Sequence, residues 1–239
     1  MLKYTYLLIN LLTIVVPLGR SFEERIGFYK KWRYYFPALL ITGLFFLTWD
    51  YLKIQHGVWT FNPRYITGIN LFGIPLEEIL FFITVPYACT FIYETVSLFI
   101  KRNLFPSALR LLLIAASVAA FVFSFSLFDK AYTFSVLFIG GIVIGLSAAL
   151  LPAKAFDKFI LTYLISLLPM AVVNGLLTGL PIVIYNNAEN SCIRIGTIPI
   201  EDFLYSAILL CMNIALYEWQ KHKYKFNPPS LTPLNPHIT

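Results

Sequence analysis

The chain has 239 residues, of which 59% are hydrophobic and 13% are charged, whereas an ordinary soluble domain carries about 25% charged residues. So little polar surface excludes a water-soluble globule for most of the chain, which is expected to lie in lipid. The formal net charge of +6 comes from short clusters of Lys and Arg between apolar segments, a distribution typical of a membrane protein on anionic lipid and not of a nucleic-acid-binding protein.

Seven apolar segments are long enough to cross a bilayer, since about 20 helical residues span its hydrocarbon core. The first is interpreted as a retained helix and not as a signal peptide, because its apolar run is long and no small-residue cleavage site follows it. The expected fold is therefore an all-α polytopic membrane protein. Its predicted membrane helices are 2–19, 34–52, 75–100, 107–128, 132–151, 157–179 and 197–219.

Basic residues indicate how these helices are oriented. The segment 20–33 holds five Lys or Arg residues, and "KHKYK" follows the last predicted helix. The loops on the other side are poorer in both residues. The positive-inside rule then predicts a multi-pass protein of the cell membrane, with its N-terminus outside and its C-terminus in the cytoplasm.

A repeated acidic motif gives the chain its internal order. The tetrapeptide "PLEE", which holds Glu77 and Glu78, returns 124 residues later as "PIED", which holds Glu201 and Asp202. Acidic residues are rare in membrane helices, so the match between the two acid pairs is stronger evidence of a repeat than the matches between apolar residues. Internal self-similarity of this kind is typical of duplicated membrane folds.

The shift of 124 residues predicts the domain organisation. A first three-helix repeat covers residues 1–106 and a second covers residues 132–222. Two units of three helices each can have the same orientation in the membrane only if one further helix joins them. The expected linker helix is therefore 107–131. The remaining residues, 223–239, form a Pro-rich cytoplasmic tail that is expected to be disordered.

The acid pairs have a structural and a functional interpretation. Pro75 and Pro199 suit the start of a helix, where neighbouring acids simply complement the helix dipole. Ionisable groups at membrane depth are, however, functional candidates by default. Of two acids in an apolar site, one can keep its proton while the other is ionised, which supplies an acid and a base without metal or organic cofactor. Glu94 and Glu218, further along the same helices, are expected at the cytoplasmic interface instead.

Other candidate site residues lie close to the acids in the sequence. Trp49 precedes Asp50 in "TWD", Trp59 lies in "GVWTFNP", and Phe81 follows the first acid pair. Aromatic faces can stabilise a cation, although such residues also pack against lipid or one another. Asn174 takes the place of Asp50 in the second half of the chain.

These motifs together resemble the membrane-embedded, flavin-free lycopene cyclases of carotenoid biosynthesis. That family occurs as two short three-helix subunits or as one fused chain, and seven helices resemble the fused form. The resemblance covers nearly all of residues 1–220. The second half departs from the first by losing the acid of "TWD" and the tryptophan of "GVWTFNP", which implies that the two halves have unequal roles.

The resemblance implies a redox-neutral cyclisation. A carboxylic acid protonates the terminal double bond of a ψ-end group of lycopene, a neighbouring double bond attacks the carbocation, and a carboxylate removes a proton to give a β-ionone ring. Reaction at both ends gives γ-carotene and then β-carotene. The expected acid and base groups are Glu77, Glu78, Glu201 and Asp202, with Asp50 orienting or relaying a proton. The expected substrate-binding side chains are Trp49, Trp59, Phe81 and Asn174.

The resemblance implies no cofactor and no metal. The expected partners are membrane lipid and the carotenoid itself, with self-association or contact with other carotenoid-pathway enzymes as further expectations. The donor acid, the number of ends cyclised, the ring isomer and a longer prenylated substrate are left open by the sequence.

Other functional classes fit the sequence less well. A proton-coupled transporter with a duplicated acidic site is the alternative, since it too would bury acids in a repeat. A retinal photoreceptor needs a Schiff-base lysine in its last helix, and residues 197–219 contain no lysine. A polyprenyl transferase needs paired Asp-rich, metal-binding motifs, which this sequence does not contain. The glycines of "GGIVIG" at 140–145 indicate close helix packing and not a dinucleotide fingerprint. The three scattered cysteines form no disulfide framework.

Overall fold

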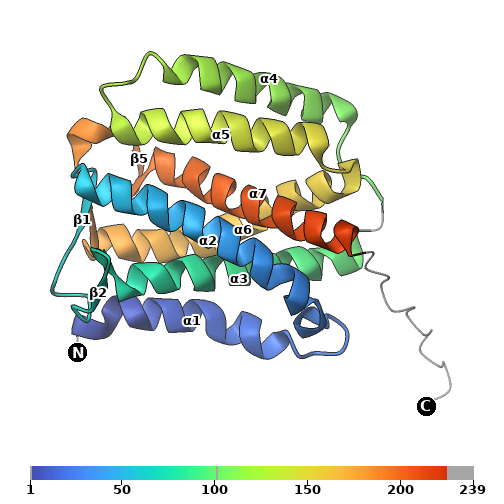
Figure 1. Cartoon of the computed structure of the whole chain (residues 1–239), viewed down its shortest axis with the longest axis horizontal. Coiled ribbons are helices and arrows are strands. Elements are labelled where there is room, and N and C mark those ends of the chain that lie inside the picture. Colours follow the sequence, from blue (N-terminus) through green and yellow to red (C-terminus); the bar gives the residue numbers. More distant parts are fainter. Residues whose placement is uncertain (1, 101, 225–239) are drawn as a thin grey trace.

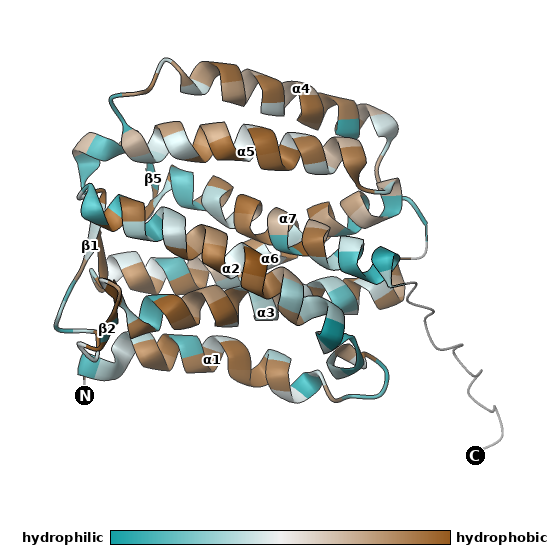
Figure 2. Ribbon diagram, viewed as in Figure 1, coloured by the Kyte–Doolittle hydropathy of each residue, from teal (hydrophilic) through white to brown (hydrophobic). Residues whose placement is uncertain are grey.

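The computed structural model describes residues 2–100 and 102–224, and within them it contains seven helices long and apolar enough to cross a membrane (Figure 1). The predicted all-α polytopic membrane fold is confirmed. Apolar residues dominate the outer helices, and hydrophilic residues gather at the two ends of the bundle (Figure 2). The helices are α1 (Thr5–Arg20), α2 (Trp32–Gln55), α3 (Leu76–Phe99), α4 (Ser107–Ser124), α5 (Ala131–Leu150), α6 (Ala153–Gly179) and α7 (Ile200–Lys223).

Several helix boundaries differ from the prediction, and two helix starts differ for local reasons. Helix α6 begins at Ala153, directly after Pro152, and its first turns carry charged residues that hydropathy does not include in a membrane span. Helix α7 begins at Ile200 because Pro199 is extended, with φ −56° and ψ 141°. The predicted tail lies outside the described residues from position 225 onward.

Six short strands lie at one end of the bundle, the end that also holds the N-terminus (Figure 1). They form three antiparallel pairs, β1 with β4, β2 with β3, and β5 with β6. Each strand has only two or three residues, which is too short to give a periodic signal in the sequence. The strands are β1 (Trp59–Phe61), β2 (Asn70–Leu71), β3 (Ile74–Pro75), β4 (Val183–Tyr185), β5 (Arg194–Ile195) and β6 (Ile198–Pro199). We call this end of the molecule the strand end.

The pairing of β1 with β4 joins the two halves of the chain. Its central pair is Thr60 with Ile184, residues that are 124 apart in the sequence, and it places Trp59 opposite Tyr185. Backbone bonds extend the match, since Asn62 N donates to Ile182 O and Asn186 N donates to Val58 O. A shift of 124 residues relates the two bonds, because Asn186 is the equivalent of Asn62 and Ile182 is the equivalent of Val58.

Helix packing follows the same spacing. Helix α1 packs on α3 as α5 packs on α7, and α2 contacts α7 as α6 contacts α3. Helix α4 packs on α5 at the edge of the bundle (Figure 1). These contacts are those that two three-helix units joined by a linker helix would make. The division into parallel repeats itself stays a prediction.

The glycines of the predicted packing motif lie at helix crossings. A Cβ atom on Gly141 would lie 2.7 Å from both Phe121 Cβ and Ser117 O of α4. Gly140 faces Leu204 of α7, where an added Cβ would meet methyl groups at 3.4 Å. Glycine therefore allows α5 to approach two neighbours at once, as expected for close packing of membrane helices.

An ion-paired cluster closes the end of the bundle opposite the strands. Glu94 is buried, forms salt bridges with Lys31 and Lys221, and accepts a hydrogen bond from Tyr217 at 2.8 Å. The matching residues in the other half make the same bond, since Tyr93 donates to Glu218 at 3.0 Å. Glu94 thus lies near the end of the bundle where the sequence places it, and there it is buried among cations.

Candidate functional site

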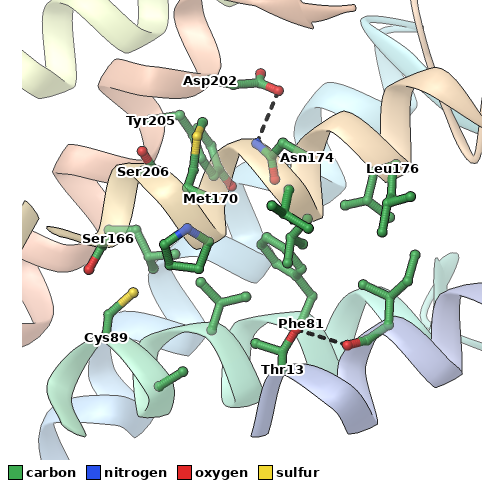
Figure 3. Close-up of a pocket in the computed structure, with 18 of the residues that line it drawn as sticks. Thr13, Phe81, Cys89, Ser166, Met170, Asn174, Leu176, Asp202, Tyr205 and Ser206 are labelled. Carbon is green, nitrogen blue, oxygen red and sulfur yellow. Dashed lines mark hydrogen bonds between the residues drawn. The ribbon is translucent and has the colours of Figure 1, made fainter. Parts of the chain in front are cut away.

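A cavity of about 610 Å³ lies inside the bundle, and most of its lining is apolar. Helices α1, α3, α6 and α7 form its walls, and Figure 3 shows part of its lining, with Asp202 of α7 facing Asn174 of α6. Three buried carboxyl groups lie at its strand end. Those carboxyl groups belong to Asp50, Glu78 and Asp202. Across the described residues, no group of three or more His, Cys, Asp or Glu side chains is arranged to hold a metal ion.

The structure separates the two members of each acid pair. Glu78 and Asp202 line the cavity, whereas Glu77 and Glu201 do not. Glu77 Oε1 accepts the backbone N–H of Thr67 at 2.6 Å. Successive helical residues point about 100° apart, so one acid of a pair faces the cavity while its neighbour faces the loop that precedes the helix.

Glu201 repeats the arrangement of Glu77 in the second half. Its Oε1 accepts the backbone N–H of Ser191 at 2.7 Å and the hydroxyl of Thr133 at 2.7 Å. Ser191 lies 124 residues after Thr67, so both acids hold the same point of their respective loops. Glu77 and Glu201 therefore fix the loops of the strand end, a role that the sequence pattern does not assign to them.

The helices that carry these acids start at proline. Pro75 and Pro199 are the N-cap residues of α3 and α7, each with extended ψ angles, of 142° and 141°. Each proline ends a short strand, β3 or β6, and fixes the direction in which the helix leaves it. The acids thus lie in the first helical turn by a local rule of the sequence.

Asp50 and Glu78 form a carboxyl pair. Tyr6 donates a hydrogen bond to Glu78 Oε2 at 2.5 Å, and Tyr205 donates to Asp50 Oδ1 at 2.9 Å. Both acids are buried and line the cavity, and Asp50 Oδ2 accepts no hydrogen bond from a donor group of the described residues. Two carboxyl groups can share a hydrogen bond only when one of them is protonated. A buried carboxyl oxygen without a donor disfavours the charged form, so the site of Asp50 favours a bound proton that a neighbouring carboxyl group could share.

Asp202 has a different environment. Tyr132 donates to its Oδ1 at 2.6 Å, Tyr185 donates to both oxygens at 3.1 and 3.0 Å, and Asn174 Nδ2 donates to Oδ2 at 3.3 Å (Figure 3). Burial and then the negative charge of Asp202 raise the pKa of the Tyr185 hydroxyl well above its ordinary value, so Tyr185 stays a donor. Three donor side chains stabilise the charged form of a carboxylate. Asp202 is thus equipped to be a base.

Aromatic side chains enclose this end of the cavity. Trp59 and Phe81 line it, and the Trp59 ring lies 5.2 Å from that of Tyr132 and 5.8 Å from that of Tyr185. Trp49 does not line the cavity. Its ring lies 4.9 Å from that of Tyr205, behind the cavity wall.

No pattern in the sequence singles out the tyrosines that hold the acids. Tyr6, Tyr132, Tyr185 and Tyr205 each donate to a cavity carboxyl group and line the cavity. The chain has 15 tyrosines, so residue type alone could not select four. A buried tyrosine hydroxyl needs a partner, but which partner it meets depends on the packing of helices distant in sequence.

Comparison with known proteins gives one family. The family model described as "Lycopene cyclase" matches residues 3–96 and 129–220. The two matched stretches leave out α4, which lies between them. The match favours a cyclase over a transporter. No solved structure gives a significant match.

Curated relatives are similar to parts of the chain. Each of three, from Podospora anserina, Leptosphaeria maculans and Neurospora crassa, is named a bifunctional lycopene cyclase/phytoene synthase. Identity to the first is 33% over 96 residues, to the second 35% over 98, and to the third 43% over 47. The matches cover 40%, 40% and 20% of this chain but only 15%, 15% and 8% of those relatives.

Proposed function

We propose that this chain, which belongs to the lycopene cyclase family, closes rings at the ψ-end groups of lycopene by acid–base chemistry. The observation that carries the proposal is a single apolar cavity holding two kinds of carboxyl site. Asp50 and Glu78 are buried and each accepts a hydrogen bond from one tyrosine, whereas Asp202 is held by three donors. Together they supply an acid and a base at the same end of a space suited to an apolar substrate.

The first step belongs to the carboxyl pair. A proton from Asp50–Glu78 forms a new C–H bond at the terminal double bond and leaves a tertiary carbocation. The electrons of a nearby double bond then form the ring C–C bond and move the positive charge into the ring. Because Glu78 and Asp50 are held by Tyr6 and Tyr205 from different helices, the pair keeps a fixed position relative to the cavity.

The second step belongs to Asp202. Removing one ring proton to this carboxylate leaves a ring double bond, and we expect the β-ionone ring. One proton enters and one leaves, so the product is an isomer of the substrate and no electron acceptor is needed. Before the next turnover Asp202 must release this proton to water and the Asp50–Glu78 pair must take one up from water.

The aromatic lining supports the charged intermediate. Trp59, Phe81 and Tyr185 line the cavity beside the acids, and aromatic faces attract a cation. An apolar, enclosed site also keeps water away from a carbocation that water would trap. Asn174 contributes by holding Asp202 and not by transferring a proton. Trp49 is expected to support Tyr205 from behind.

The remaining expectations concern surroundings and partners. We propose that the protein lies in the cell membrane with its strand end outside. The basic residues at the opposite end, which include Lys31, Lys154 and Lys221, support that orientation through the positive-inside rule. Membrane lipid and carotenoid are the expected partners, and self-association or contact with other pathway enzymes stays an expectation.

Expression in a lycopene-accumulating bacterium tests the function. Chromatography of the extracted pigments should show γ-carotene and β-carotene at the expense of lycopene, with Glu78→Gln as the inactive control. Unchanged lycopene, with the protein present in the membrane fraction, would contradict the proposal.

A further inference from the structure

The cavity lies between the two halves of the molecule, and the equivalent space on the side of α2 is filled. Met170 and Val173 of α6 line the cavity. The residues 124 positions earlier, Phe46 and Trp49 of α2, are buried in a core cluster instead. Their rings lie 5.4 Å apart and within 5.1 Å of the Tyr205 ring. Two large aromatic side chains thus occupy the space that Met170 and Val173 leave open.

The cavity opens sideways between α1 and α6. Its rim includes Leu12 and Val16 of α1 and Leu168, Val172 and Leu176 of α6. All five side chains are at least 42% exposed at the surface of the bundle. Figure 3 shows Leu176 of α6 and Thr13 of α1 on opposite sides of this space. Since both helices are long enough to span a membrane, the rim faces lipid and not water.

The cavity is elongated away from the acids. On α6 its lining runs from Tyr163 to Thr178, which is roughly 22 Å of helix at about 1.5 Å per residue. The carboxyl groups of Asp50, Glu78 and Asp202 lie at the strand end of this slot. A linear apolar molecule can therefore place one end at the acids while its remainder lies along the slot and in the lipid.

We propose that the cavity admits one end of a linear polyene at a time, through the opening between α1 and α6, and that each ring closes in a separate binding event. This inference rests on the proposed function. The described cavity holds one set of cavity acids, and a rigid conjugated chain cannot bring its second end to them without withdrawing. The monocyclic product therefore leaves the enzyme before the second ring forms.

A pulse–chase experiment tests the separation of the two events. Purified protein in liposomes receives ¹³C-labelled lycopene, followed by a large excess of unlabelled lycopene. The monocyclic product should exceed the amount of enzyme many-fold, and the chase should dilute the label in bicyclic product. Fully labelled bicyclic product that forms despite the chase, with monocyclic product never above the amount of enzyme, would overturn the inference. Absence of any ring would overturn the proposed function and the inference with it.

A matched pair of variants tests the opening. Leu168→Trp places a large ring at the rim, and Leu44→Trp makes the same change at the equivalent position of α2, which is 59% exposed and does not line the cavity. Leu168→Trp should slow formation of both rings by about tenfold or more, equivalent to about 1.4 kcal/mol, while Leu44→Trp keeps the rate of the unmodified protein. Equal rates for the two variants at equal membrane levels would overturn entry between α1 and α6.

Discussion

Asn174 donates a hydrogen bond to Asp202 at 3.3 Å, and the residues 124 positions earlier, Asp50 and Glu78, are two carboxylic acids that line the same cavity. The amide N–H of Asn174 donates a hydrogen bond to the carboxyl group but cannot transfer its proton. A carboxyl group at this position can exchange a proton with its neighbour. One substitution between the halves therefore turns two related acid sites into a proton-holding pair and a stabilised carboxylate.

This difference predicts that position 50 requires an acid and position 174 requires an amide. Asp50→Asn should lower the rate of ring closure by about 100-fold or more, because the pair loses the partner with which Glu78 shares its proton. Asn174→Asp should also lower the rate, because Asp202 loses a donor and gains a second acid beside it. The rate of ring formation in liposomes checks both. Asp129→Asn, in an exposed loop, is the control, and a loss there as large as at Asp50 would contradict the assignment.

The two acids of each doublet should respond differently to amide substitution. Glu78→Gln and Asp202→Asn should each slow turnover by about 100-fold or more, since an amide cannot transfer the proton. Glu77→Gln and Glu201→Gln keep an oxygen that can accept the loop N–H groups, so they should cost only about 1–3 kcal/mol of stability and leave most of the turnover per folded molecule. Thermal unfolding and turnover measured together separate the two effects. Equal loss of turnover at all four positions would mean that the split is not functional.

The tyrosine donors to Asp202 should matter for the rate and not for folding. Tyr185→Phe removes a hydrogen bond to a charged group, worth about 1.5–3 kcal/mol, which corresponds to roughly a 10- to 100-fold slower reaction if it is lost from the transition state. Tyr51→Phe changes the same atoms on a 40% exposed side chain of α2 and should be neutral. The measurement is the initial rate of ring closure at equal protein level. An unchanged rate for Tyr185→Phe would exclude Tyr185 from holding the base.

Glu94 should be important for stability and not for turnover. It is buried between Lys31 and Lys221 at the end opposite the acids, and removing one partner of a buried ion pair costs about 3–5 kcal/mol. Glu94→Gln should therefore lower the unfolding temperature while the folded fraction keeps its turnover. Glu23→Gln breaks the exposed pair with Arg20 and should change stability by at most about 1 kcal/mol. Turnover lost in Glu94→Gln without loss of stability would contradict this role.

The sequence predicts the membrane architecture well, because crossing a bilayer needs long apolar runs and these are visible without structure. The acid doublets are also visible, since charge is rare in such runs. What distinguishes Glu78 from Glu77 is not visible, because it depends on helix phase relative to a loop that ends at Thr67. The cavity is hidden for a similar reason. It depends on Met170 and Val173 occupying less space than Phe46 and Trp49, and only packing shows that these side chains face the equivalent spaces.

The short strands and the roles of the tyrosines could not be predicted from sequence patterns, because both depend on contacts between residues far apart in the chain. The pairing of β1 with β4 joins residues separated by 124 positions, and each strand has at most three residues. Tyr205 reaches Asp50 across 155 positions. Contacts of this kind follow from the completed bundle, so the donors around each acid could not be assigned before it was described.

Deuterium incorporation tests the central claim, that a carboxyl pair protonates the substrate and a separate carboxylate takes a proton away. Purified protein in liposomes, equilibrated in heavy water, is given lycopene, and the products are analysed by mass spectrometry and NMR. The account predicts one deuterium for each ring formed, bound at the carbon that is protonated, and almost no product from Glu78→Gln. Rings that form at the normal rate without deuterium would contradict it.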